Sequence, residues 1–172
     1  MMRVVLIIIS ALCGLLMIGG LVGYSYEDSI EDVVVPPLGQ VGFADDPLTE
    51  SALPSSLINA ELTITWSEED VWVGLVTEDE YERCQPSNGM SQTCMGTDTV
   101  TYAAGGPNSL ESKSFTYEIS GDVYYPVDGG PSFDPDGTTM DVEFTVHVTL
   151  AWPVITVLGL LGTGLLVIAQ RI

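Results

Sequence analysis

The chain has 172 residues, enough for one domain with membrane anchors and too few for two sizeable hydrophobic cores. All 24 acidic residues lie between Glu27 and Glu143, where the basic residues are Arg83 and Lys113, so this stretch carries 24 negative and two positive charges. Nucleic acid is excluded as a predicted partner, because phosphate binding needs clustered Lys and Arg. The acidity indicates either adaptation to high salt and solubility, or recruitment of divalent cations or a basic partner.

The first apolar segment, Val4 to Val22, has no charged residue and follows Arg3. An α-helix of this length reaches ~28 Å, about the thickness of the hydrocarbon core of a bilayer. We therefore predict an N-terminal transmembrane helix within residues 1–23. A signal peptide cleaved at Gly23-Tyr24-Ser25 is the alternative, although the apolar core of a signal peptide usually has only ~7–15 residues.

Residues 24–56 are rich in Pro, Asp and Ser. Pro36 and Pro37 follow a short apolar run, Val33 to Val35. This composition favours turns and extended loops over a packed core. We interpret the segment as a juxtamembrane stalk with one edge strand.

Residues 57–150 change to a pattern in which apolar and polar side chains alternate, which is typical of half-buried strands. Strands are predicted at residues 60–66, 71–76, 99–102, 115–119, 123–127 and 140–150. Packed antiparallel sheets bury one face of each such strand. The predicted fold class is therefore mainly β, a small antiparallel β-sandwich flanked by two transmembrane helices. The spacing Thr77-Glu78-Asp79-Glu80, typical of a helix N-terminus, predicts one short helical turn.

Cys84 and Cys94 lie ten residues apart in a loop with Pro86 and Gly89. A Cys-x-x-Cys metal site needs tighter spacing and more ligands. We predict a disulfide between the two cysteines, which fits an oxidising compartment outside the cytoplasm. Cys13 falls inside the first apolar segment, where it is interpreted as a small apolar side chain.

One acidic cluster has the residue types of a calcium site. Asp134-Pro135-Asp136-Gly137 resembles part of an EF-hand loop, but Ser132 stands where the first Asp is expected. A looser calcium site is the remaining metal prediction, and a solvated acidic turn between two strands is the alternative. The candidate ligands are Asp128, Asp134, Asp136, Asp141 and Glu143.

His147 is the sole histidine, and it falls on the polar face of the last predicted strand. The sequence offers it neither a second histidine nor a nucleophile motif, so no catalytic triad is identified. We interpret His147 as an ordinary surface residue, and we predict that the protein is not an enzyme.

The second apolar segment, Ala151 to Ala169, predicts a C-terminal transmembrane helix and short tail within residues 151–172. Arg3 and Arg171 both flank the apolar segments, and basic residues favour the cytoplasmic side of a membrane. Both termini are therefore predicted to be cytoplasmic, with residues 57–150 outside. Small residues that favour close helix packing occur in both segments: Ser10, Gly14, Gly19, Gly23, Gly159, Gly162 and Gly164.

Two segments, VWVGLVTEDEYERC at residues 71–84 and SFTYEISGDVYY at residues 114–125, resemble the GOLD domain of the emp24 (p24) family. This resemblance implies a membrane-anchored β-sandwich with one disulfide that serves in protein–protein contact. The chain departs from that family, because it has neither a coiled-coil stretch before its last apolar segment nor a sorting signal in its tail. A role in trafficking does not carry over, whereas that of an interaction module does.

These features lead to two functional hypotheses. The first is a membrane-tethered extracytoplasmic interaction or accessory domain, without catalytic activity, that binds another membrane or envelope protein. Its anchors would contact the lipid bilayer. The alternative is a calcium-dependent surface-binding module built on the acidic loop.

Overall fold

The computed structural model describes residues 2–37, 39–48, 56–119, 121–130 and 138–171. The chain forms two compact units. The first contains Met1–Ser25, Pro54–Ala60 and His147–Ile172, and we call it the helical unit. The second contains Tyr26–Leu53 and Glu61–Val146, and we call it the β unit. The boundary between the units falls within strands that belong to both.

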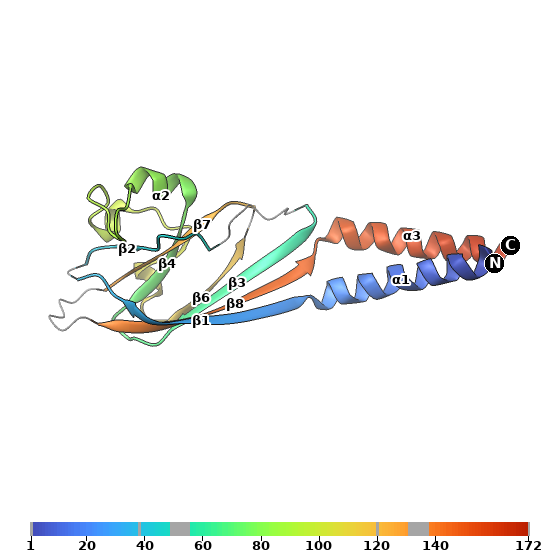
Figure 1. The fold of residues 1–172 in the computed structure, drawn as a ribbon, viewed down its shortest axis with the longest axis horizontal. Coiled ribbons are helices and arrows are strands. Elements are labelled where there is room, and N and C mark those ends of the chain that lie inside the picture. Colours follow the sequence, from blue (N-terminus) through green and yellow to red (C-terminus); the bar gives the residue numbers. More distant parts are fainter. Residues whose placement is uncertain (1, 38, 49–55, 120, 131–137, 172) are drawn as a thin grey trace. The chain divides into compact units, whose positions relative to one another are not determined.

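The helical unit contains helix α1, Met2–Val22, and helix α3, Trp152–Arg171, which lie side by side (Figure 1). Both helices are long and apolar enough to cross a membrane. A core helix of a soluble protein would be mostly buried, yet α1 has no buried residue and both helices expose most of their large apolar side chains. The two predicted apolar helices are thus confirmed as helices.

Small residues bring α1 and α3 close together at two positions on α3. Ser10 Oγ donates a hydrogen bond of 2.7 Å to the backbone oxygen of Gly162. A Cβ atom on Gly162 would lie 3.3 Å from Cys13 Cβ, and one on Gly159 would lie 3.5 Å from Met17 Sδ. No atom lies within 4 Å of a Cβ built on Gly14, Gly19 or Gly164. Close packing through small residues therefore occurs at Gly159 and Gly162, and not at these three glycines.

The contact between Cys13 and Gly162 allows a direct test of the helix pair. We expect Gly162→Cys to form a disulfide with the native Cys13 under mild oxidation, because the two Cβ atoms lie within bonding range. Mass spectrometry of the proteolysed, unreduced chain would detect the linked α1 and α3 peptides. Gly164→Cys is the matched control and should give no such link. Equal yields from both variants would contradict the described packing.

The β unit is built from two antiparallel sheets of four strands each. The first sheet has the order β1-β8-β3-β6, and the second has the order β2-β7-β4-β5. The strands of the first sheet are β1 Tyr24–Val34, β8 Thr139–Leu150, β3 Ile58–Trp66 and β6 Ser114–Ile119. Those of the second are β2 Gly42–Phe43, β7 Tyr124–Gly129, β4 Trp72–Thr77 and β5 Ala104–Gly105.

Five of the predicted strands are confirmed, with small differences at their ends. The strand predicted at residues 99–102 is wrong: Thr97–Thr99 form a 3-10 turn, and the short strand β5 begins only at Ala104. The backbone N–H of Thr101 bonds to the carboxylate of Glu80 instead of to a neighbouring strand. A side-chain carboxylate therefore accepts the hydrogen bond of this backbone N–H, which the predicted strand would have donated to a neighbouring strand.

Residues 24–56 differ from the predicted stalk. The expected edge strand is present, but it runs over the whole of β1, and β2 adds a second strand from the same segment. All side chains of β1 except that of Val33 are exposed. Exposed edge strands can carry many charged side chains, and their composition then resembles that of a stalk. For this reason the sequence did not reveal the full length of β1.

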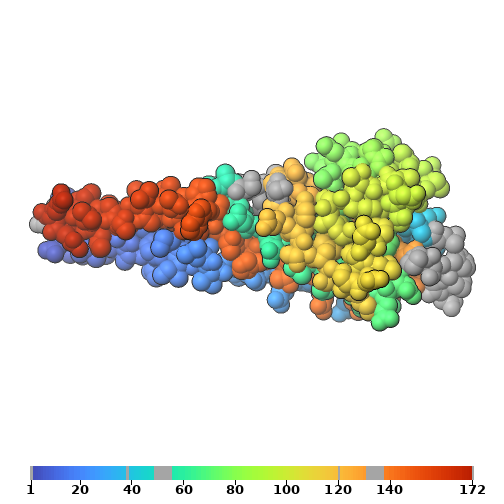
Figure 2. All heavy atoms as spheres, turned by 180° about the vertical axis from the view of Figure 1, so that it is seen from behind, coloured from blue at the N-terminus to red at the C-terminus, as the bar shows by residue number. Residues whose placement is uncertain are grey.

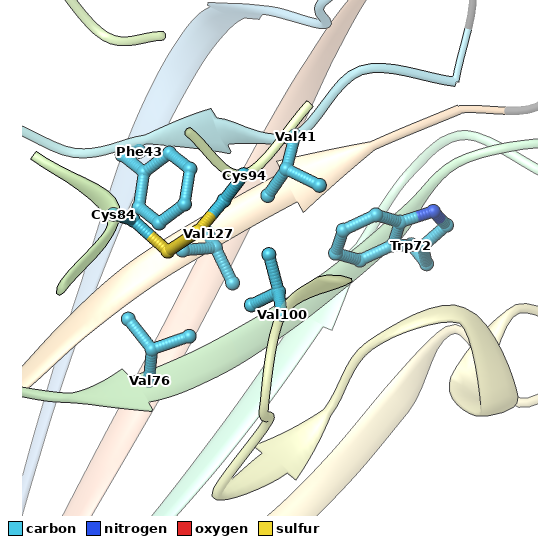
Figure 3. Packing of buried hydrophobic residues seen from close by; sticks show 8 residues of the cluster. All are labelled: Val41, Phe43, Trp72, Val76, Cys84, Cys94, Val100 and Val127. Atoms are coloured by element: carbon cyan, nitrogen blue, oxygen red, sulfur yellow. A yellow bond between two sulfur atoms is a disulfide. The ribbon is translucent and has the colours of Figure 1, made fainter. Parts of the chain in front are cut away.

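Strand β4 has both of its faces buried, which explains its nearly continuous apolar sequence. Trp72 and Val76 lie on one face and pack in a cluster with Phe43 and Val127 (Figure 3). Cys84 and Cys94 belong to the same cluster. Through them the short helix α2, Glu78–Cys84, and the loop that follows it pack against strand β4 and its neighbours. In the space-filling view α2 and this loop, coloured green to yellow-green, form a continuous lobe (Figure 2).

The predicted disulfide between Cys84 and Cys94 is confirmed. Both cysteines are fully buried, and the bond lies beside Phe43 and Val127 (Figure 3). Ser91 adds a second tie across the same loop, because its Oγ donates to Cys84 O and accepts from Cys94 N at 2.9 Å. The lobe is therefore held by a covalent bond and by a buried hydroxyl.

Helix α2 begins where the sequence predicts, with the Thr77 hydroxyl accepting a hydrogen bond from Glu80 N. The Glu80 side chain is mostly buried and bonds to Arg83 Nε at 2.8 Å and to Thr101 N at 2.7 Å. Hydrogen bonding to Arg83 lowers the pKa of the Glu80 carboxyl. Arg83 also donates to Thr99 O at 2.6 Å, so the pair joins α2 to the loop that follows the disulfide.

We expect Glu80→Ala to lower the free energy of unfolding by about 1–3 kcal/mol, because the backbone N–H of Thr101 and the side chain of Arg83 lose an acceptor. Glu80→Gln should cost less, since its amide oxygen can still accept from Thr101. The folded pKa of Glu80 is depressed, so its stabilising contribution is present above pH ~4.5 and is lost as the pH falls through the folded pKa. Urea denaturation at pH 7 and pH 3 checks this, and a Glu80→Ala effect that is equal at both would contradict it.

Candidate functional site: an apolar cavity around Asp128

A cavity of about 430 Å³ lies inside the β unit, and both sheets contribute side chains to its wall. Met140, Val142 and Phe144 alternate along β8, so they point to the same side of the first sheet. Val73 of β4 contributes to the wall from the second sheet. Cavities of ~300–1,000 Å³ with mostly apolar walls are typical of sites for small organic molecules.

Asp128 is the one ionisable residue among those that line this cavity in the described part of the chain. It lies on β7, where Tyr124, Pro126 and Asp128 alternate on the face toward the first sheet. Its neighbours across the sheet are Gly42 on β2 and Val73 on β4. The sequence thus places a carboxyl group near the end of β7, where the other cavity-lining residues in the described part of the chain are not ionisable.

The carboxyl group of Asp128 is poorly satisfied. The residue as a whole keeps some contact with solvent, yet its Oδ2 atom is buried and has no hydrogen-bond partner among the described residues. Burial raises the pKa of the Asp128 carboxyl to about 7, and a hydrogen bond from its own backbone N–H opposes the rise. Burying a carboxylate without a partner costs folding free energy, and such groups are often found at functional sites. Asp128 is therefore a candidate functional residue.

Gly42 makes room for the carboxyl group. A Cβ atom at position 42 would overlap Asp128 Oδ1 and would lie 3.3 Å from Pro36 Cδ. Only glycine therefore lets the Asp128 side chain lie against β2 without a displacement.

The cavity reaches the surface next to the edge strand β1. Ile30 and Val34 line the cavity and are nevertheless 54% and 71% exposed. Met90, in the loop after the disulfide-linked Cys84, lines it as well and is 48% exposed. The rim of the cavity thus consists of exposed apolar side chains, of which that of Met90 is flexible, and a ligand could enter there.

The five candidate calcium ligands have different surroundings. Asp134 and Asp136 lie outside the described residues. Asp141 and Glu143 are exposed on β8, on the face opposite to Met140 and Val142, whereas Asp128 faces the cavity. In the described ranges no three His, Cys, Asp or Glu residues are grouped so that they could hold a metal ion. Calcium binding stays a prediction.

His147 has a neighbour that the sequence did not reveal. Ser25 Oγ and His147 Nδ1 lie 2.8 Å apart, and both residues belong to the helical unit. A catalytic serine–histidine pair usually has a carboxylate that orients the imidazole. In the described part of the chain, the hydrogen bonds of His147 include none to a carboxylate. We interpret the contact as a cross-strand hydrogen bond between β1 and β8.

No family model matches the chain. A search of curated proteins finds no match either. Among solved structures, the chain is similar to PliG of Aeromonas hydrophila, a periplasmic inhibitor of g-type lysozyme, with 7% identity, a TM-score of 0.38, and coverage of 74% of this chain and 88% of that one. It is also similar to the protein FLHE, with 9% identity, a TM-score of 0.35, and coverage of 73% and 96%. A third similarity is to a chain of the Israeli acute paralysis virus particle, with 10% identity, a TM-score of 0.36, and coverage of 76% and 74%. TM-scores this low carry no argument about fold or function, and the GOLD resemblance stays a prediction.

The sequence named Asp128 as a calcium candidate and did not predict the cavity. The predicted strand ends at Val127, whereas β7 continues to Gly129. Extending the alternation Tyr124, Pro126 by two residues would have placed Asp128 on the inner face. The sequence signal for this site is an acidic residue, Asp128, at the position that continues the inward-facing side of a strand.

Proposed function

We propose that this protein is a membrane-tethered extracytoplasmic binding domain that acts as an accessory to another membrane or envelope protein and has no catalytic activity. The observation that carries the proposal is the pair of terminal helices, which pack on each other at Ser10 and Gly162 while their large apolar side chains stay exposed. Such surfaces are favourable in lipid and unfavourable in water. The hydrogen bond between α1 and α3 also favours a retained first helix over a cleaved signal peptide.

The orientation rests on charge and on cysteine chemistry. Arg3 and Arg171 flank the two apolar helices and favour cytoplasmic termini, which puts the acidic β unit on the other side. The bond between Cys84 and Cys94 is consistent with an oxidising compartment. These two features support the same arrangement independently.

The edge strand β1 is the surface that we assign to the protein partner. It ends the strand order of the first sheet, and edge strands are templates for pairing with another chain. Tyr26, Ile30 and Val34 are at least half exposed on it. The same strand carries Glu27, Asp28, Glu31 and Asp32, so a partner with basic side chains would complement it.

Site-specific cross-linking in native membranes tests the accessory role. A photoreactive benzophenone side chain at Tyr26 on β1 should give a discrete adduct with one other membrane protein. The same side chain at Thr116, which is exposed on β6 at the opposite edge of the sheet, should not give it. Adducts limited to lipid, or identical adducts from both positions, would contradict the proposal.

A further inference from the structure

We propose that the cavity of the β unit binds a small apolar molecule that carries one ammonium group, with this group hydrogen-bonded to the carboxylate of Asp128. The inference rests on the proposed function as a binding domain and names a ligand class for it. Strand β1 borders the cavity, but the partner surface is tested at Tyr26, which does not line the cavity, and the ligand site at Asp128, so the two can fail separately.

The missing hydrogen-bond partner of the Asp128 carboxyl group indicates that the ligand carries an ammonium group. Asp128 Oδ2 is buried without a partner among the described residues, although buried charges are normally paired and buried polar atoms are normally hydrogen-bonded. Among the residues that line the cavity, the described part of the chain contains no Lys or Arg that could pair with it. A ligand with an N–H donor and a positive charge would supply both missing interactions.

The sign of the charge follows from the domain as a whole. Residues 27–143 carry 24 acidic and only two basic side chains, which attracts cations and repels anions. An anionic amphiphile such as a fatty acid would be repelled by the acidic surface and again by the carboxylate of Asp128 inside the cavity. The ligand is therefore cationic.

The apolar body follows from the wall. Met90, Val142 and Phe144 line the cavity and keep exposed or partly exposed apolar surface. Ile64, Val73 and Met140 also line it, are almost completely buried and offer no nitrogen or oxygen side-chain atom. Phe43 and Phe144 add aromatic surface. A hydrocarbon chain or ring would bury apolar area against these side chains, and a purely polar cation would gain nothing from them.

Ligands of equal length and different head groups test the proposal. Octylamine, octanol and octanoate would be titrated into the full-length chain, kept in solution by a non-ionic amphipathic polymer so that no bilayer is needed. Thermal unfolding reports binding, because a ligand that binds the folded state raises the melting temperature in a saturable way. We expect octylamine to bind about tenfold or more tightly than the other two, since a charge-assisted hydrogen bond is worth roughly 10- to 100-fold in affinity.

Matched variants separate the site from the acidic surface. Asp128→Asn should weaken octylamine about tenfold or more and bring it to the level of octanol. Glu118→Gln removes an exposed charge on β6 and should leave the affinity within about twofold. Ala44→Trp, which adds volume at the cavity wall, should weaken octylamine and octanol alike.

Three results would overturn the proposal: no saturable effect of octylamine, equal binding of octanoate, or octylamine binding that is unchanged in Asp128→Asn. If the Tyr26 adduct forms while octylamine fails to bind, the proposed amine site is wrong and the proposed accessory role is still supported. If octylamine binds through Asp128 while no adduct forms, the binding site stands and the accessory role is removed.

Discussion

At pH 8, Asp128→Leu should unfold at a higher temperature than the native chain, by about 5 °C or more. The native carboxyl is held in an apolar cavity, which raises its pKa from 3.8 to about 7, so at pH 8 the folded state contains a buried carboxylate that the unfolded state exposes to water. Leucine removes this charge and adds apolar surface in a cavity that has room for it. Thermal unfolding followed by circular dichroism measures the difference.

The sign of the pH dependence follows from proton binding. Between the unfolded pKa near 3.8 and the folded pKa of about 7, the folded state holds a proton that the unfolded state has lost. Native stability therefore falls as the pH rises through this window, by roughly 1 kcal/mol per pH unit. The advantage of Asp128→Leu should be largest above pH 7 and smallest near pH 4. An advantage that grows on acidification, or that is absent at pH 8, would show that the carboxyl is not buried as described.

Glu118→Gln provides the control for this measurement. It also removes one negative charge, but from an exposed position on β6. General repulsion within the acidic domain would make both variants more stable by similar amounts. A change confined to Asp128 assigns the effect to burial.

Removing the disulfide is expected to destabilise the β unit by about 2–5 kcal/mol. Closing a ten-residue loop contributes roughly 2–3 kcal/mol through the entropy of the unfolded chain. The remainder comes from packing, because Cys84 and Cys94 are fully buried beside Phe43 and Val127. Urea denaturation of Cys84→Ala/Cys94→Ala against the native chain gives the value.

Reductant supplies the matched comparison. The native chain should lose stability in dithiothreitol, whereas the alanine pair should be insensitive to it. The pair in which both cysteines become serine should be less stable than the alanine pair, because two hydroxyl groups would be buried in an apolar cluster. A native chain that keeps its full stability under complete reduction would contradict the structural role given to the bond.

The strong alternations of the sequence predicted the strands of the β unit well. Ala60, Leu62, Ile64 and Trp66 are all buried on β3, as their spacing requires, and Thr77 caps helix α2 as its position before three acidic residues indicates. These features depend on local periodicity and on side chain-to-backbone bonds, which a sequence records directly. The disulfide between Cys84 and Cys94 was likewise predicted from the spacing of the two cysteines, which disfavours a metal site, and it is confirmed.

The features that were missed depend on the partner strand rather than on the segment itself. Strand β1 is held in the sheet by backbone pairing at an edge, where its side chains stay exposed and leave no alternation. The cavity lies between two sheets whose strands come from many separate parts of the chain, and no local pattern encodes it. The inward position of Asp128 depends on the extension of β7 to Gly129, two residues beyond the predicted end of the strand.

Labelling of single cysteines in intact cells tests the tethered arrangement most directly. In a chain in which Cys13 is replaced by alanine, Ser29→Cys lies on the exposed edge strand β1 and Gln170→Cys lies at the end of α3. A membrane-impermeant maleimide should modify position 29 in intact cells, and position 170 only after permeabilisation. Equal modification of both positions in intact cells, or a mature chain that begins near Tyr26, would contradict the arrangement.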